Sequence, residues 1–203
     1  MTPEAITEMF GGAHYRFARW ARPMAPVVFG VDDTTLATIR GAFDALTRLT
    51  GQPLAETDPE LGANVMIFAF RDWAELRSVP NLDRMIDGLT PLLDRLEAEN
   101  ASHYRMMRLD ETGAIRAAFV FLRMSGPLAD VPAADLALDL AVQVALLWSD
   151  TAFANRSPLA VLEGGHVVLR PEIGALIRAA YDPVLPDTAS DAAHALRLAA
   201  RMG

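Results

Sequence analysis

The sequence of 203 residues contains no cysteine and no lysine. Without cysteine the chain can form no disulfide, no thiolate zinc site and no cysteine nucleophile. All 18 basic residues are therefore arginine, and they are scattered along the chain. The formal net charge is −8, whereas nucleic-acid binding usually requires a basic face. We therefore expect no nucleic-acid partner.

Long apolar runs and targeting signals are also lacking. No apolar stretch reaches the roughly 18 residues that a membrane span requires, so we expect no transmembrane segment. The first residues, 1–8, have neither the basic nor the apolar region of a signal peptide. As written, the sequence predicts a cytoplasmic protein. It predicts a periplasmic protein or a lipoprotein if a native signal peptide precedes this start.

Known catalytic motifs are missing as well. The chain has no Gly-x-Ser-x-Gly, no phosphate loop, no dinucleotide fingerprint and no His-Glu-x-x-His. The four histidines, His14, His103, His166 and His194, show none of the spacings that place two ligands on one helix face. We therefore assign no catalytic, cofactor-binding or metal-binding residue and expect no cofactor. His103 and His194 are expected at the surface, and His166 in a turn.

What the sequence does contain is a high hydrophobic fraction of 52%, arranged in clear periodicities. Strands are predicted at 24–31, 63–70, 104–109, 114–123, 159–162 and 167–169, and helices at 3–11, 32–50, 71–78, 82–99, 130–148 and 170–181, with a last helix capped by Thr188. The segment 63–70 is apolar on both faces, which predicts an interior strand with Val65, Ile67 and Phe68 buried. Two prolines place 24–31 at a sheet edge.

This order of elements predicts the fold class. Early strands followed by helices indicate an α+β fold, with a single mixed β-sheet and helices packed mainly on one face. We expect residues 1–203 to form one domain, in which 1–22 are an N-terminal helix or arm and 186–203 contain a C-terminal helix.

One polar stripe interrupts the predicted helix at 130–148. Asp135, Asp139 and Gln143 recur every four residues and therefore share a face. Either this face is the solvated edge of a buried helix, or it lines a cleft in which a carboxylate can bind a cation or transfer a proton. Asp150 follows the helix and can join the other three. These four residues form our candidate cleft.

Two further residues are secondary candidates. Trp20 stands among arginines, where it can stack on a ligand or close one edge of the core. His166 ends a Glu-Gly-Gly-His sequence that fits a catalytic turn and equally a simple hairpin turn. We favour a structural role for both.

Short motifs spread along the chain show a family resemblance. They are Met9–Tyr15 (Met-Phe-Gly-Gly-Ala-His-Tyr), Arg19-Trp20, Pro23, Leu49-Thr-Gly51, Ala63-Asn-Val65, Gln143, Leu147, Asp150 and Tyr181-Asp182-Pro183. In order and spacing they resemble the proteobacterial family known as domain of unknown function 2927. Some of its members are described as putative lipoproteins.

The resemblance bears on the predicted helix at 130–148. The family's helix carries Glu-x-x-Gln followed by Leu-Gly-Leu-x-Asn-Asp. This pattern is similar to a degenerate form of the zincin His-Glu-x-x-His helix. Gln143 and Asp150 match this pattern, but Leu140 stands at the family's Glu, Leu146 at its Gly and Ser149 at its Asn. In a zincin that Glu is the general base and the two His bind zinc. The resemblance therefore implies a zincin-like fold whose helix is degenerate and metal-free, and not an active zinc metalloprotease.

Three functions follow as hypotheses. The first is a non-enzymatic binding or scaffolding domain, a pseudoenzyme that recognises another protein or a component of the cell envelope. The second is a carboxylate-based hydrolase, metal-independent or Mg²⁺-assisted, that uses Asp139, Gln143 and Asp150. The third is a sensor domain with an apolar pocket for a small molecule beside the helix. The sequence favours the first, because the catalytic motifs are missing from an otherwise well-patterned fold.

Overall fold

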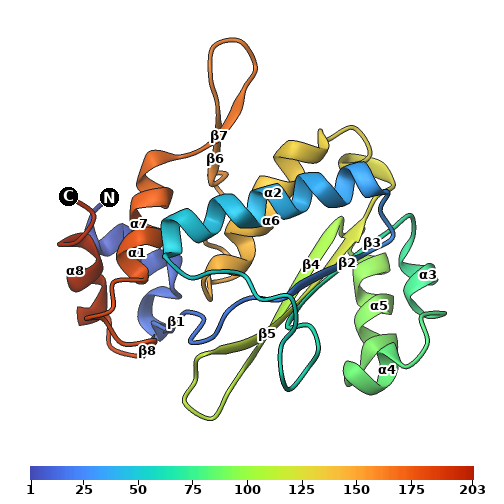
Figure 1. Ribbon diagram of the computed structural model, residues 1–203, viewed down its shortest axis with the longest axis horizontal. Helices are drawn as coiled ribbons and strands as arrows, with labels where there is room; N and C mark the ends of the chain where they lie inside the picture. Colours follow the sequence, from blue (N-terminus) through green and yellow to red (C-terminus); the bar gives the residue numbers. More distant parts are fainter.

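A four-stranded mixed sheet lies at the centre of the computed structural model, which describes residues 1–203 (Figure 1). Its strands are β2 (Pro26–Phe29), β3 (Val65–Phe70), β4 (His103–Leu109) and β5 (Ile115–Arg123). They lie in the order β2-β3-β5-β4, with β2, β3 and β5 parallel and β4 antiparallel to β5. The predicted α+β class with a mixed sheet is confirmed, as is the edge position of β2.

The two interior strands are buried on both faces. Val65 and Ile67 of β3 are fully buried and face one core, whereas Phe68 is 3% exposed and faces the other. Alternate residues of β5 divide between the same two cores. The prediction of an interior strand with these three residues buried is confirmed.

Three helices, among them the two longest of the chain, cover one face of the sheet. They are α2 (Asp33–Thr50), α6 (Ala133–Ala145) and α7 (Pro171–Ala180), accompanied by the terminal helices α1 (Pro3–Met9) and α8 (Ala193–Ala199). In Figure 1, α2 runs beside α6. The Asp32 side chain caps α2 by accepting a hydrogen bond from the Thr35 amide, and Gly51 ends the helix with a φ of 69°. This side holds the larger core.

Three other helices cover the opposite face, where the prediction of one helix over 82–99 is wrong. The elements are α3 (Trp73–Leu76), α4 (Leu82–Met85) and α5 (Leu89–Ala98). Between α4 and α5, Ile86 is extended and Gly88 has a φ of 73°. The apolar spacing continues across this break because both helices bury their leucines in the same core. Hydrophobic periodicity alone therefore could not reveal the interruption.

The two ends of the chain pack together. Strand β1 (Phe17–Ala18) pairs with β8 (Thr188–Ala189), and the Tyr15 hydroxyl lies 2.9 Å from Nδ1 of His194. His194 is only 2% exposed, so its predicted surface position is wrong. Thr188 does not cap the last helix either. Asp191 accepts a hydrogen bond from the Ala193 amide instead, because Thr188 is engaged in β8.

The remaining elements are local. Strands β6 (Leu159–Val161) and β7 (Val167–Leu169) form the predicted hairpin, which projects from the body of the molecule (Figure 1). Two short 3-10 helices, η1 (Gly12–His14) and η2 (Gly126–Leu128), complete the fold. None of the helices combines the length and the apolar character that a membrane crossing requires.

Candidate site: a cleft between the edge strand and helix α6

Helix α6 is shorter than the predicted helix at 130–148. It begins after Pro132 and ends at Ala145, beyond which Leu146 is extended. Leu146 forms a bridge with Arg19, and the Leu147 amide donates to the carbonyl of Ala18. The chain leaves the helix because the N-terminal segment offers its backbone these extended partners, a tertiary contact that the helical periodicity does not encode.

Most of α6 is buried in the larger core. Leu140 is 2% exposed, and the neighbouring Ala141 and Val142 are equally enclosed. The apolar side chain of Leu140 packs at a position where a carboxylate would be costly to bury. Only one narrow stripe of α6 is polar.

That stripe borders an open cleft of about 730 Å³ between α6 and β4. Asp139, Gln143 and Asp150 line the cleft together, as the candidate set predicts. Asp135 does not line it, because it lies one turn further from the cleft along α6. The remaining walls come from the end of α5, from β4 and from the loop 149–158.

Arg105 is a residue of the cleft that sequence reasoning missed. Its Nη1 donates to the carbonyl oxygen of Gln143 and, at 3.0 Å, to the side-chain Oε1 of the same residue. Its Nη2 donates to the carbonyl oxygen of Trp148 at 3.0 Å. Arg105 therefore fixes the end of α6 against the edge strand. One signal was available, since Arg105 shares its strand face with the apolar Met107 and Leu109.

The charges of the cleft are perturbed by burial. Burial raises the pKa of the Asp139 carboxyl above its usual range, although His103, a hydrogen bond with the Gln143 side chain and Arg105 oppose the rise. Burial also lowers the pKa of the Arg105 guanidinium, against the favourable charges of Asp150 and Asp139. Asp139 and Gln143 thus line a partly enclosed polar cleft and not an open helix edge. Their functional role stays a prediction.

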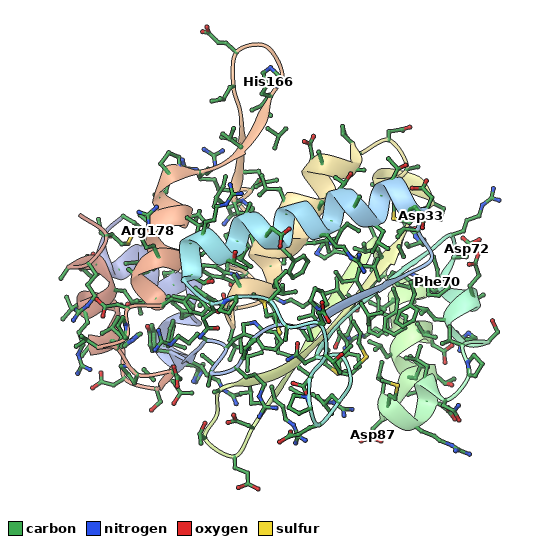
Figure 2. The ribbon with its side chains drawn as sticks, viewed as in Figure 1. Asp33, Phe70, Asp72, Asp87, His166 and Arg178 are labelled. Carbon is green, nitrogen blue, oxygen red and sulfur yellow. The ribbon has the colours of Figure 1, made fainter.

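The two secondary candidates lie elsewhere. Trp20 is fully buried, and its indole Nε1 donates to the carbonyl of Val144 at 2.7 Å, which ties the N-terminal segment to α6. His166 lies near the tip of the β6–β7 hairpin, far out from the body of the molecule (Figure 2). Neither residue lines the cleft.

Three carboxylates and one histidine line the cleft, namely Asp139, Asp150, Glu99 and His103, but α6 itself contributes only one of these potential metal ligands. Zinc prefers histidine, cysteine and carboxylate ligands, whereas the polar stripe of α6 presents one carboxylate, Asp139, and one amide, Gln143. No group of three or more histidine, aspartate or glutamate side chains anywhere in the structure comes together closely enough to hold an ion. These residues therefore do not fit a zincin zinc site.

Searches against protein-family models, curated proteins and solved structures find no match to this chain.

Proposed function

We propose that this chain is a non-enzymatic binding domain that holds its ligand in the cleft between β4 and α6. One observation carries the proposal: residues from a strand, a helix and a loop meet at a single cleft, and Arg105 fixes them there through three hydrogen bonds. A polar cleft with charged groups on rigid elements is the usual form of a binding site.

The chemistry of α6 supports binding in preference to zinc hydrolysis. In this proposal α6 is a degenerate, metal-free counterpart of a zincin helix. Leu140 can neither accept nor donate a proton, and Asp139 with Gln143 is a poor zinc pair. The parallel strands, the antiparallel edge strand β4 and the helix beside it agree with such an origin.

A second candidate function is a carboxylate-based hydrolase, metal-independent or Mg²⁺-assisted, with Asp139, Gln143 and Asp150 as its working residues. The observation that favours it is the raised pKa of the Asp139 carboxyl, because acid–base groups are often tuned in this way. The sensor hypothesis receives less support, since only five of the 15 residues that line the cleft are hydrophobic.

The proposal is tested by NMR on the isotope-labelled chain with four probes: guanidinium chloride, N-acetyl-lysine amide, glutamate and N-acetylglucosamine. We expect at least one probe to shift the amides of Asp139 and Asp150 in a saturable way. Asp139→Asn should weaken that response, and Asp135→Asn should not, because Asp135 lies on the same helix outside the cleft. Absence of any shift in the cleft, both with these probes and with peptide ligands, would refute a binding role.

A parallel assay separates binding from catalysis. The chain is incubated with casein, a nitrophenyl ester and a nitrophenyl phosphate, with and without Mg²⁺, and products are followed by mass spectrometry. We expect no product above the buffer control. Turnover that Asp139→Asn abolishes and Asp135→Asn preserves would overturn the non-enzymatic proposal in favour of the hydrolase.

A further inference from the structure

The free edge of β4 runs along the cleft. β4 is the last strand of the order β2-β3-β5-β4 and pairs with β5 alone. The Arg123 amide donates to the Ser102 carbonyl at 2.8 Å, so these two opposed residues are a hydrogen-bonded pair of the antiparallel ladder. Because bonded positions alternate in such a ladder, Tyr104 and Met106 direct their backbone groups at β5.

The intervening residues of β4 therefore point their backbone outward. His103, Arg105 and Met107 carry the N–H and C=O groups of the open edge, and none of these groups bonds to another loop or helix. A row of unpaired backbone groups on an edge strand is a template for a further strand. Here the template lies beside the cleft, because His103 and Arg105 also form part of its wall.

Hollows flank this edge on both faces of the sheet. On the α6 face lies the cleft, and on the α5 face lies a smaller hollow of about 310 Å³. Ile86, Pro91, Leu92 and Met106 supply the apolar part of the smaller hollow. Tyr104 lines both hollows, so the two meet around the strand itself. A strand added to β4 would place alternate side chains into the one hollow and the other.

The charges of the cleft indicate which side chains would enter it. Arg105 already donates to the carbonyls of Gln143 and Trp148, whereas the carboxylates of Asp139, Asp150 and Glu99 are in no ion pair within the chain. The cleft therefore offers three unpaired carboxylates against the one unpaired guanidinium of Arg95. The smaller hollow is mainly apolar and carries one charge of each sign, Asp87 and Arg95. Basic side chains suit the first, and aliphatic side chains suit the second.

We propose that the ligand is an extended peptide segment that pairs with the free edge of β4, its basic side chains entering the cleft and its alternate aliphatic side chains entering the hollow beside α5. This inference rests on the proposed binding function and names the class of ligand. The backbone bonds supply affinity without regard to sequence, and the two hollows supply the alternating preference.

The test uses an acetylated heptapeptide of alternating lysine and leucine, a block peptide of the same composition, and an alternating peptide with every second amide N-methylated. Affinity is measured by fluorescence anisotropy. We expect the alternating peptide to bind about tenfold more tightly than either control, because only it combines the side-chain alternation with a complete row of backbone donors. The N-methylated peptide is prepared in two forms, with methyl groups on the odd-numbered or on the even-numbered amides. Strand pairing would be overturned if both forms bind as tightly as the unmethylated alternating peptide.

Hydrogen exchange locates the contact. The amides of Arg105 and Met107 should exchange more slowly with the alternating peptide bound, while those of Tyr104 and Met106, already bonded to β5, should change little. Unchanged exchange at both outward amides overturns the proposal. The outward amides could instead be protected without peptide, with a protection that grows with protein concentration and with the fraction of dimer measured by sedimentation. The occupant of the edge is then a second copy of this chain, and the proposal also fails.

A matched pair of variants separates the backbone from the side chain. His103→Pro removes one outward N–H and leaves the ladder to β5 intact, since proline is tolerated on an edge with its nitrogen toward solvent. His103→Ala removes the same side chain and keeps that N–H. We expect the proline variant to bind the alternating peptide at least about fivefold more weakly than the alanine variant, with equal melting temperatures. Equal affinities for the peptide would contradict the proposal.

The outcomes distinguish the two proposals. If small probes shift the cleft amides but no peptide protects β4, the peptide inference fails and the binding function stands. If neither probes nor peptides act on the cleft, both fail.

Discussion

The guanidinium of Arg105 and the side chain of Gln143 join the edge strand to the end of α6, with Nη1 3.0 Å from Oε1. The same nitrogen also donates to the Gln143 carbonyl, and Nη2 donates to the carbonyl of Trp148. α6 ends at Ala145, so its last carbonyls lack helical partners. Arg105 therefore supplies, from a neighbouring strand, a donor to one helix-end acceptor, the Gln143 carbonyl, beside the cleft that Asp139 lines.

Replacing this arginine should destabilise the fold. Arg105→Met keeps much of the aliphatic stem but leaves the carbonyls of Gln143 and Trp148 without their charged donor. We expect a loss of about 2–3 kcal/mol in the free energy of unfolding, measured by urea denaturation. Arg16→Met is the control, because Arg16 is exposed and its side chain forms no hydrogen bond. Similar losses in both variants would show that the Arg105 contacts contribute little.

Asp139 should reduce stability at neutral pH. Because its folded-state pKa is raised, the folded chain binds a proton there more readily than the unfolded chain. The carboxyl therefore contributes most to the free energy of unfolding below its ordinary pKa of 3.8. This contribution is lost as the pH rises through the folded-state pKa. Asp139→Asn resembles the protonated acid and should raise the melting temperature at pH 7.

The comparison with acid conditions makes that prediction specific. The advantage of Asp139→Asn should shrink as the pH falls toward 3.8, since the wild-type carboxyl then carries its own proton. Calorimetry at several pH values measures this difference. A melting temperature that drops at pH 7 would mean that the ionised carboxylate stabilises the fold, contrary to the effect of its burial.

The interior strand offers a test of the core. Ile67 is fully buried between β3 and the helices of the larger core, so Ile67→Ala should cost roughly 2–5 kcal/mol in denaturant unfolding. Val161→Ala is the matched control on the projecting hairpin, where the valine is 72% exposed, and it should change stability by less than about 0.5 kcal/mol. A loss below about 1 kcal/mol at Ile67 would contradict the strand's interior position.

Elements with strong local signals could be predicted from the sequence. The Asp32 cap and Gly51 delimit α2, and the apolar run in β3 identifies an interior strand. Elements that end through tertiary contact could not. α6 stops where Leu146 meets Arg19, and Thr188 joins β8 through its pairing with β1 and so cannot cap a helix. Local propensity contains no information on these distant partners.

The candidate site divides in the same way. Asp139 and Gln143 could be found because helical spacing places them on one face. Arg105 and His103 could not be assigned to the cleft, since only the register of β4 against β5 and its position beside α6 bring them there. Asp135 shares the stripe but lies beyond the cleft, because the cleft spans only the C-terminal part of α6.

His194 should make the fold sensitive to acid. Burial lowers the pKa of its imidazole to about 4, and the positive charges of Arg197, Arg19 and Arg201 act in the same direction. The folded chain thus holds a neutral imidazole against the Tyr15 hydroxyl, while the unfolded chain takes up a proton near pH 6.5. Stability from this group is therefore complete above pH 6.5 and is lost as the pH falls toward 4.

The size of that loss can be isolated with two variants. The glutamine of His194→Gln cannot be protonated. Between pH 6.5 and 4 the free energy of unfolding of this variant should therefore fall by about 2–3 kcal/mol less than that of the wild type. His166→Gln serves as the control, because His166 is exposed on the projecting hairpin, and it should keep the wild-type pH dependence. Urea denaturation at half-unit steps of pH measures all three proteins. Parallel curves for wild type and His194→Gln would show that the buried imidazole is not the acid-sensitive group, and the contact between Tyr15 and the C-terminal helix would then have no part in the response to pH.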